Sequence, residues 1–540
     1  MPELASPMMW FAAAAPIAVV LALMVGLRWG ATKAGPAGWV VSLLVAATVF
    51  GAGPKLLLLS QGKAVVRSMF VLYIIWLALA LYNVVSEAGA LDAIGAGMSR
   101  LTADRTMQLL ILAWVFSSFL QGVTGFGVPV AVVAPMLVGL GFPPLASVVA
   151  TGVAHGWAVT FGSLASSFYA MLAVTGMDGA DLAPWTAALL GLACLPCGMV
   201  AAAMHQGRRS VAHALPAILV LWVVMAGTQY ALAVAGLWSM AAFGAGIAGL
   251  VASAAVVRMG RYRAAAMGPT APGSDSAGGV GSSVGHPTAT GAGEGGGMGF
   301  FEAMSAYFVL LAVVVVGGLV GPVRDALDTV SYTATFPETQ TSLGWVNEAA
   351  AERALHVFGH AGALILYTCA FAFAIYWLRG RYEPGAAARV VAATIRGSIK
   401  PTIGILFMVG MAMFMADSGM TYALALGISR GLGFAFPVVS PFIGALGAFV
   451  TGSNTNSNVL FAGLQEGTAT LLGLNVLLLL GAQNLGGAVG SVFAPAKVIV
   501  GCSTVGLAGC EGDALRQILV YGLAIVALGS VVVGVISLLP

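Results

Sequence analysis

Long apolar runs recur along the whole chain and alternate with short polar stretches. Each run is long enough for a helix of about 20 residues to cross a hydrocarbon core about 30 Å thick. The runs lie near residues 8–27, 37–54, 66–86, 144–175, 184–204, 212–233, 238–257, 303–320, 359–378, 399–416, 474–505 and 516–539. The pattern predicts an all-α polytopic membrane protein with about 12 transmembrane spans.

Two further apolar stretches, at 106–141 and 436–466, are each interrupted in the middle. The first break runs from Gly122 to Pro129, and the second runs from Thr451 to Asn458. If the second break were a polar surface loop, the apolar arms on both sides would be too short to span. Backbone that breaks at membrane depth survives only where protein or a water-filled cavity satisfies its N–H and C=O groups. We therefore predict two re-entrant hairpins.

The two halves of the chain repeat each other. At an offset of 330 positions Glu87 corresponds to Asp417, and six further positions carry identical residues. In both copies, a span that ends in an acid and a Gly is followed by an amphipathic piece, a hairpin and a broken span, at 144–175 and at 474–505. The number of crossings between the copies is odd, so we predict two inverted repeats, an architecture of secondary transporters.

The same pattern divides the chain into five segments. They are 1–60 (N-terminal spans), 61–258 (first repeat half), 259–299 (linker), 300–395 (connecting spans) and 396–540 (second repeat half). The linker is made of Gly, Ser, Ala, Pro and Thr, and a segment with so little to bury is expected to be disordered. The polar stretch 321–358 is expected to be a structured external loop.

Composition excludes several classes of protein. The 540 residues are 60% hydrophobic and 8% charged, whereas soluble proteins carry about 25% charged residues. The mean hydropathy is +0.99, and the formal net charge of +3 is too small to indicate a nucleic-acid partner. No Cys or His beside Cys194 and Cys197 completes a metal-binding set. We expect neither a metal site nor a cofactor.

The positions of Lys and Arg predict how the chain is oriented in the membrane. Basic residues gather at 208–209, 258–263 and 379–400, whereas the loop with Asp178 has none. The positive-inside rule makes these three loops and the linker cytoplasmic, which puts both termini on the outer side of the membrane. Three basic residues near the third span run against this orientation: Lys55, Lys63 and Arg67.

The paired breaks predict where a ligand binds. A half-helix that begins in mid-membrane points free N–H groups and a partial positive charge at the break, which favours a small organic anion. The second break also holds six consecutive hydrogen-bonding side chains, and burying such groups unpaired is costly. The predicted substrate-binding residues are Thr124, Gly125, Phe126, Gly127, His155, Ser163, Ser453, Asn454, Thr455, Asn456, Ser457, Asn458, Gln483 and Asn484.

The chain resembles the bacterial lactate permease family of proton-coupled carriers of 2-hydroxy monocarboxylates. The motifs that carry the resemblance are Gly125-Phe126-Gly127-Val128-Pro129-Val130-Ala131, Leu137-Val138-Gly139-Leu140-Gly141-Phe142, Phe161-Gly162, Thr451-Gly452-Ser453-Asn454-Thr455-Asn456-Ser457-Asn458 and Gly486-Gly487. The resemblance covers most of the chain outside the linker. It implies a lactate- or glycolate-like substrate, proton symport, a place in the bacterial inner membrane and the hairpin fold of a wider ion-transporter superfamily.

The chain departs from the family pattern at three positions. Gln121 stands where family members usually have Glu, and His155 follows Ala154 where Asn is common. Lys497 stands in a stretch that is expected to be neutral. The departures move a titratable group and bring a cation into the membrane region, which is compatible with a subgroup that carries a different organic anion.

Four ionisable residues are candidates for coupling or anion binding. His155 is a candidate proton carrier, and the alternative is a histidine hydrogen-bonded for packing. Lys497 is a candidate partner for the substrate carboxylate; alternatively it pairs with an acid such as Glu466 or reaches the interface. Glu87 and Asp417 end matched helices, where a proton relay competes with a solvated or capping role.

Other functions stay open at this point. A sodium-coupled carrier of another organic anion, such as a dicarboxylate, would use the same hairpins, with the Asn- and Ser-rich tip holding sodium. A channel needs a continuous polar pore, whereas polar residues here gather at two central breaks. A hydrolase needs an acid beside His155 and Ser163, and the sequence offers none nearby, so we do not expect an enzyme. The oligomeric state is not predicted.

Overall fold

The computed structural model describes residues 6–27, 29–99, 101–125, 127–259, 262, 298–352, 354–507 and 510–539. Helices dominate this part of the chain, and eleven of them are long and apolar enough to cross a membrane, or up to thirteen if each bent helix pair is one span. The prediction of an all-α polytopic membrane protein is confirmed. The predicted linker, 259–299, falls outside the described residues except for Met259, Tyr262, Met298 and Gly299.

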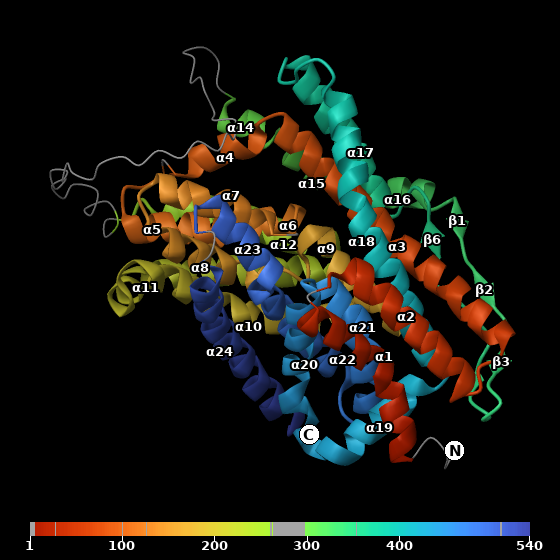
Figure 1. Cartoon of the computed structure of the whole chain (residues 1–540). Coiled ribbons are helices and arrows are strands. Elements are labelled where there is room, and N and C mark those ends of the chain that lie inside the picture. The colour runs from red at the N-terminus through yellow and green to blue at the C-terminus, as the bar shows by residue number, and fades with distance from the viewer. Residues whose placement is uncertain are drawn as a thin grey trace.

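The first half of the chain contains the first repeat and four additional long helices. Its helices are α1 (Pro7–Gly26), α2 (Ala31–Thr48), α3 (Pro54–Glu87), α4 (Ala90–Ser99), α5 (Arg105–Leu109), the π-helical η2 (Leu110–Phe116), α6 (Ser117–Val123), α7 (Val128–Gly139), α8 (Pro144–Ala154), η3 (Gly156–Ala158), α9 (Gly162–Thr175), α10 (Gly179–Gln206), α11 (Arg208–Val234) and α12 (Trp238–Val256). Figure 1 shows them in red to yellow.

The second half contains the second repeat. Its helices are α14 (Phe300–Ala303), α15 (Ser305–Leu319), α16 (Gly321–Leu327), α17 (Ala361–Leu378), α18 (Ala386–Asp417), α19 (Met420–Leu432), η5 (Gly433–Ala435), α20 (Phe436–Thr451), α21 (Asn454–Leu471), α22 (Val476–Gly490), η6 (Ser491–Phe493), α23 (Pro495–Thr504) and α24 (Glu511–Ser537). The order from α3 to α10 recurs from α18 to α24: a long helix, an amphipathic helix, a hairpin, a broken span and a second long helix.

The matched helices α3 and α18 cross each other in opposite directions. Lys63 Nζ lies 3.2 Å from Asp417 Oδ2 near one end of the crossing, and Arg389 Nη2 lies 2.7 Å from Glu87 Oε1 near the other. Two hydrogen bonds lie between these ion pairs, from Trp76 to Thr402 and from Asn83 to Thr394. Along the crossing, the residue numbers of α3 rise while those of its contacts in α18 fall, so the two helices are antiparallel. The repeats are therefore inverted.

Both hairpins turn at glycines, whose backbone allows it. The second hairpin turns at Gly452, which has φ +73° and ends α20, and Ser453 then caps α21 by accepting a hydrogen bond from Asn456 N at 3.4 Å. The first hairpin turns through Gly125 and Gly127, with φ of +63° and +88°. Helices α8 and α9 meet at a bend of 50°.

The bend between α8 and α9 contains three consecutive left-handed residues that are not glycine. Ser163, Leu164 and Ala165 have φ of 48°, 56° and 65°. A left-handed residue with a Cβ costs about 1–2 kcal/mol, so this turn stores strain that the surrounding packing must hold. All three residues are buried.

Six short strands form a ribbon beside α3 (Figure 1). They pair as three antiparallel ladders: β1 (Ser331–Tyr332) with β6 (Leu355–His356), β2 (Thr335–Phe336) with β5 (Ala350–Ala351), and β3 (Thr339–Gln340) with β4 (Val346–Asn347). Asn347 Nδ2 donates to Asp417 O at 2.6 Å, and Ser342 N donates to Gly51 O at 2.9 Å. We call this end of the protein the strand face.

The opposite end is the linker face. Arg381 pairs with Glu302 of α14 at 2.7 Å, and Tyr382 OH donates to Val84 O, near the end of α3, at 2.9 Å. Thus α3 runs from the strand face to the linker face.

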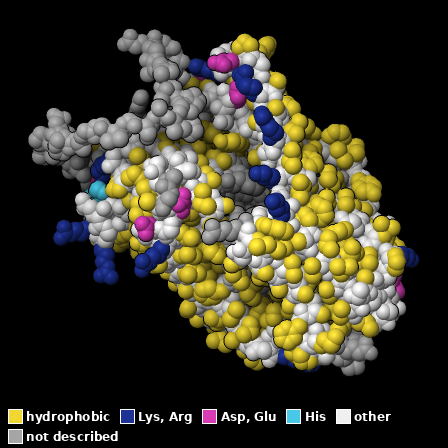
Figure 2. Space-filling model, in the orientation of Figure 1, with side chains coloured by type: hydrophobic (Ala, Val, Ile, Leu, Met, Phe, Trp, Pro, Cys, Tyr) yellow, Lys and Arg dark blue, Asp and Glu magenta, His cyan; other side chains and the backbone are white. Residues whose placement is uncertain are grey.

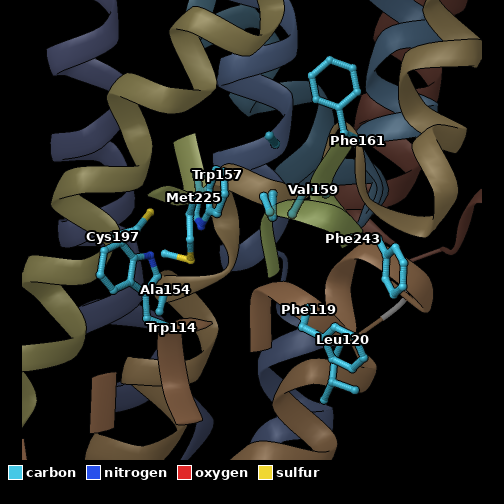
Figure 3. Packing of buried hydrophobic residues seen from close by; sticks show 14 of the residues in the cluster. Trp114, Phe119, Leu120, Ala154, Trp157, Val159, Phe161, Cys197, Met225 and Phe243 are labelled. Carbon is cyan, nitrogen blue, oxygen red and sulfur yellow. The ribbon is translucent and has the colours of Figure 1, made fainter. Parts of the chain in front are cut away.

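The first hairpin is embedded in the apolar core. In Figure 3, Trp114, Ala154, Trp157 and Cys197 gather from η2, α8, η3 and α10, while Phe119 of α6 lies near Phe243 of α12. A Cβ on Gly122 would come within 2.5 Å of Phe243 Cα, and one on Gly246 would come as close to Phe119 Cα. Small residues thus bring α6 and α12 into close backbone contact, as in other membrane helix pairs.

Candidate functional site

Both hairpin tips meet the break of the first broken span. At the second tip, Asn454 Nδ2 donates to Thr160 Oγ1 at 2.9 Å, and Thr455 Oγ1 lies 2.9 Å from Ser167 Oγ. At the first tip, Ser163 Oγ donates to Thr124 O at 3.3 Å. Segments nearly 300 positions apart in sequence thus converge on residues 160–167.

The second tip continues into a buried network with α22. Asn458 Nδ2 donates to Asn484 Oδ1 at 2.8 Å and to Ser167 O at 3.0 Å. Gln483 Nε2 donates to Ser457 Oγ at 3.1 Å. The hairpin and the second broken span are therefore joined by side-chain amides, and neutral polar groups fill the interior here.

Two glycines set how closely the tips approach their partners. A Cβ on Gly125 would lie 1.9 Å from Ser163 Oγ, and one on Gly487 would lie 2.0 Å from Asn454 Oδ1. A side chain at either position would push a tip away from its partner.

Two amide oxygens at the second tip are buried without a hydrogen-bond partner among the described residues: Asn454 Oδ1 and Asn456 Oδ1. The orientation of Asn454 follows from its partner. Thr160 donates its hydroxyl hydrogen to Asn484 O at 3.1 Å, so its oxygen accepts from Asn454 Nδ2. The free oxygen of Asn454 can therefore accept from a bound donor or contact a cation.

Lys497 lies between the first hairpin tip and the break of the second broken span. Its Nζ donates to Ser491 Oγ at 3.2 Å, and its Cγ lies 3.7 Å from the position of a Cβ on Gly127. Within the described part of the chain Lys497 forms no ion pair, and the alternative pairing with Glu466 is not found. A half-buried cation without a carboxylate partner beside a hairpin tip is suited to an anionic ligand.

His155 is buried where the first broken span packs against the second. The neighbouring Gly156 packs against Val489 and Val492 of the second broken span. His155 Nδ1 donates to Thr151 O at 2.6 Å, because a carbonyl oxygen can only accept. In the neutral ring Nε2 then carries the lone pair, and it has no partner among the described residues.

The acids Glu87 and Asp417 lie in ion pairs between α3 and α18. Their partners are Arg389 and Lys63, and Ser60 Oγ also donates to Asp417 Oδ2 at 2.7 Å. Neither acid hydrogen-bonds to a hairpin tip in the described structure. Phe126, predicted at the first tip, lies outside the described residues.

Sequence reasoning missed several polar residues of the network. They are Thr160, Ser167, Thr186 and Gln465, which bond to Asn454, Thr455, Asn484 and Gln483. All four are buried polar side chains in predominantly apolar stretches, and a buried polar group needs a partner. Their polarity there was an available signal, although it does not reveal the partner.

A cavity of about 690 Å³ reaches the second tip. Its walls include Thr451 and Gly452 at the tip, Ala496 after the break of the second broken span, Trp29 between α1 and α2, and Glu511 at the start of α24. The second hairpin enters from the strand face, so the cavity reaches its tip from the other side. Nearby, the surface is hollowed between α23 and α18, and Lys and Arg side chains follow α18 along the edge (Figure 2).

Within the described residues, no group of three His, Cys, Asp or Glu side chains is placed to hold a metal ion. The fold and the paired breaks instead define a class: multi-pass membrane proteins with inverted repeats and re-entrant hairpins, which include secondary transporters.

Within this class the chain belongs to the L-lactate permease family, whose model matches residues 10–539. The L-lactate permease of Bacillus subtilis is 28% identical over 518 residues, which cover 90% of this chain and 88% of that protein. The L-lactate permease of Escherichia coli K12 is 28% identical over 502 residues, 86% and 84% of the two chains. The glycolate permease GlcA of Escherichia coli K12 is 26% identical over 543 residues, 97% and 94%. The family resemblance seen in the sequence is confirmed.

Among solved structures, the chain is similar to the YdaH transporter of Alcanivorax borkumensis. It is 16% identical with a TM-score of 0.46, and the match covers 89% of this chain and 87% of that one.

Proposed function

We propose that this protein carries small monocarboxylates of the lactate or glycolate type across the bacterial plasma membrane. The names of its relatives describe permeases, which favours a carrier over an enzyme. The observation that carries the proposal for this chain is Lys497, a half-buried cation without an ion-pair partner among the described residues, beside Gly127 of the first tip. A carboxylate bound there would neutralise the amine and accept a hydrogen bond from Lys497.

The transport cycle in this proposal is alternating access. The cavity at the second tip gives access from the side of the α1–α2 and α23–α24 connections. Movement of one repeat against the other would close this cavity and open its counterpart on the strand face.

The coupling ion in this proposal is a proton, taken up by His155. Its Nε2 is buried without a partner among the described residues, and Gln121 replaces the acid that family members usually carry. A proton on Nε2 would add positive charge near the site and favour binding of an anion.

The orientation in this proposal puts the linker face in the cytoplasm and both termini outside. Two of the basic residues that ran against this orientation are ion-paired, Lys63 with Asp417 and Arg67 with Glu352. Their pairing reduces the conflict with the positive-inside rule.

A sodium-coupled carrier of another organic anion, such as a dicarboxylate, remains the second candidate. It is favoured by the two unpartnered amide oxygens of Asn454 and Asn456, because sodium binds neutral oxygen ligands.

Uptake into proteoliposomes tests the proposal. We expect labelled lactate or glycolate to accumulate under an inward proton gradient and not under a sodium gradient alone. We expect Lys497→Gln to abolish uptake, whereas Lys55→Gln, a cation at the start of α3, should leave it unchanged. Accumulation of a dicarboxylate that requires sodium would replace the first candidate with the second.

A further inference from the structure

A second cationic group lines a cavity whose walls include no residue of the hairpin tips. Arg67 of α3 lines a cavity of about 390 Å³ between α3, the end of α9 and the strand ribbon. Its Nε donates to Glu352 Oε2 at 2.8 Å, and its Nη2 donates to Glu352 Oε1 at 3.1 Å. This two-point contact is the geometry in which a guanidinium binds any carboxylate.

The guanidinium is held in place independently of Glu352. Arg67 Nη1 donates to Val174 O at 2.9 Å. Val174 lies in the last turn of α9, where carbonyl oxygens lack helical partners and the helix dipole favours a cation. Arg67 itself sits on a helix of 34 residues. The two N–H groups that hold Glu352 would therefore keep their direction if the carboxylate left.

Glu352 is held more weakly. It follows β5 in a ribbon of two-residue ladders, and its backbone N donates to Ala334 O at 2.8 Å. Such short ladders have little stability of their own. The side chain of Glu352 is 8% exposed and that of Arg67 is 21% exposed, so the pair is shielded but borders the cavity.

We propose that Arg67 is a second binding site for the substrate carboxylate, and that Glu352 occupies this site as an internal competitor. A substrate anion would take the two N–H groups of Arg67 while Glu352 moves away with the ribbon. The proposal rests on the proposed function for its substrate class.

The walls of the cavity select the ligand. They are mostly apolar, formed by Val66, Phe70, Leu172, Ala173, Met177 and Leu355. Asp178 also lines the cavity, and its Oδ1 accepts from Ala180 N at 2.9 Å. An additional carboxylate on the ligand would meet apolar surface and this negative charge. The site therefore fits a short monocarboxylate better than a dicarboxylate.

Aromatic rings separate this site from the hairpin tips. Phe70 packs on Tyr169 with ring centroids 5.9 Å apart, and Tyr169 packs on Trp238 at 5.8 Å. Ser167, which contacts the second tip, lies beyond Tyr169 on α9. Arg67 is thus a loading site at the strand face, to which the anion binds before the transport site opens.

Protection of an engineered cysteine from a membrane-impermeant thiol reagent tests the proposal. Ala351 lines the cavity, and its neighbour Ala350 does not. In a Cys510→Ser background, which removes the exposed cysteine, we expect lactate to slow labelling of Ala351→Cys but not of Ala350→Cys. Adding Glu352→Gln should lower the half-protecting lactate concentration at least about fivefold, because the competitor loses its charge. Arg67→Gln should abolish protection, and Arg67→Lys should weaken it.

Labelling measures binding without transport, so the two proposals can fail separately. Lys497→Gln should stop uptake but leave protection at position 351 intact. If the wild type carried no monocarboxylate while lactate still protected this cysteine, only the proposed function would fail. Labelling at the same rate with and without lactate in the Glu352→Gln variant would overturn the loading site.

Discussion

At the first hairpin tip, a missing side chain decides how closely two segments approach. Gly125 combines φ +63° with a Cβ position 1.9 Å from Ser163 Oγ. Gly236, in the turn before α12, has φ +76° and open space around its Cβ position. The two positions share the backbone requirement and differ in the contact, so they form a matched pair.

We expect Gly125→Ala to lower transport at least about tenfold and Gly236→Ala to leave it within about twofold, although each should cost roughly 1–2 kcal/mol of stability. Ser163→Gly added to Gly125→Ala removes the colliding hydroxyl and should restore part of the uptake. Uptake rates and thermal unfolding of purified protein measure both effects. Equal losses of transport in the two alanine variants would show that the contact between Gly125 and Ser163 is not needed for transport.

His155 gives a prediction about coupling. If its Nε2 carries the proton, His155→Gln should abolish uptake driven by a proton gradient and retain exchange of labelled for unlabelled substrate, because exchange moves no net proton. His205→Gln, at the end of α10, is the control and should change neither assay. Proton-driven uptake that persists in His155→Gln would remove this histidine from the mechanism.

At the scale of elements, the crossing of α3 and α18 carries two ion pairs that occupy related places and differ in burial. The side chains of Lys63 and Asp417 are 10% and 12% exposed, whereas those of Arg389 and Glu87 are 46% and 26% exposed. Removing one partner of a buried pair leaves an uncompensated charge, at a cost of about 3–5 kcal/mol, while exposed pairs contribute about 0–1 kcal/mol.

We therefore expect Asp417→Asn to lower the unfolding temperature of the protein in detergent far more than Glu87→Gln does. Adding Lys63→Met to Asp417→Asn should recover most of the loss, because no charge then stays unpaired. If Asp417→Asn kept full stability but lost only proton-driven uptake, a proton relay would explain Asp417 better than a structural ion pair.

The elements that could be predicted from sequence are those with a local signal. Glycine and asparagine clusters mark the hairpins, and the repeated order of segments marks the inversion. The contact between Asn454 and Thr160 had no such signal, because Thr160 is one hydroxyl in an apolar run. The left-handed turn at Ser163, Leu164 and Ala165 was also missed, because these residues avoid that conformation unless tertiary packing imposes it. The two-residue strands are too short for an alternating pattern to appear.

At the scale of the whole molecule, the two repeats occupy different states. The second tip borders an open cavity with Ala496, whereas the corresponding stretch of the first repeat, around Ser166, is buried. If the two repeats exchanged conformations, the cavity at Ala496 would close and the stretch around Ser166 would open.

We expect Ala496→Cys and Ser166→Cys, each in the Cys510→Ser background, to react with a thiol reagent in different states of the cycle. The state in which one cysteine reacts should be the state in which the other is protected. Conditions that favour the structure described here should expose position 496 from the cytoplasmic side, and substrate gradients that reverse the cycle should expose position 166 from the outer side. High reactivity at both positions in one state would indicate a continuous channel and contradict alternating access.

The antiparallel crossing of α3 and α18 has a consequence for assembly. Corresponding helices that touch across a two-fold axis form an isologous interface, the kind that joins two identical subunits. In such an interface, a contact made by one half recurs in the other. Asp417 pairs with Lys63, and its counterpart Glu87 pairs with Arg389. Arg389 lies four residues from the position that matches Lys63. The covalent connection between the halves is then dispensable. Fragments 1–259 and 298–540, co-expressed as separate chains, should associate through this interface and transport substrate, while either fragment alone should be degraded.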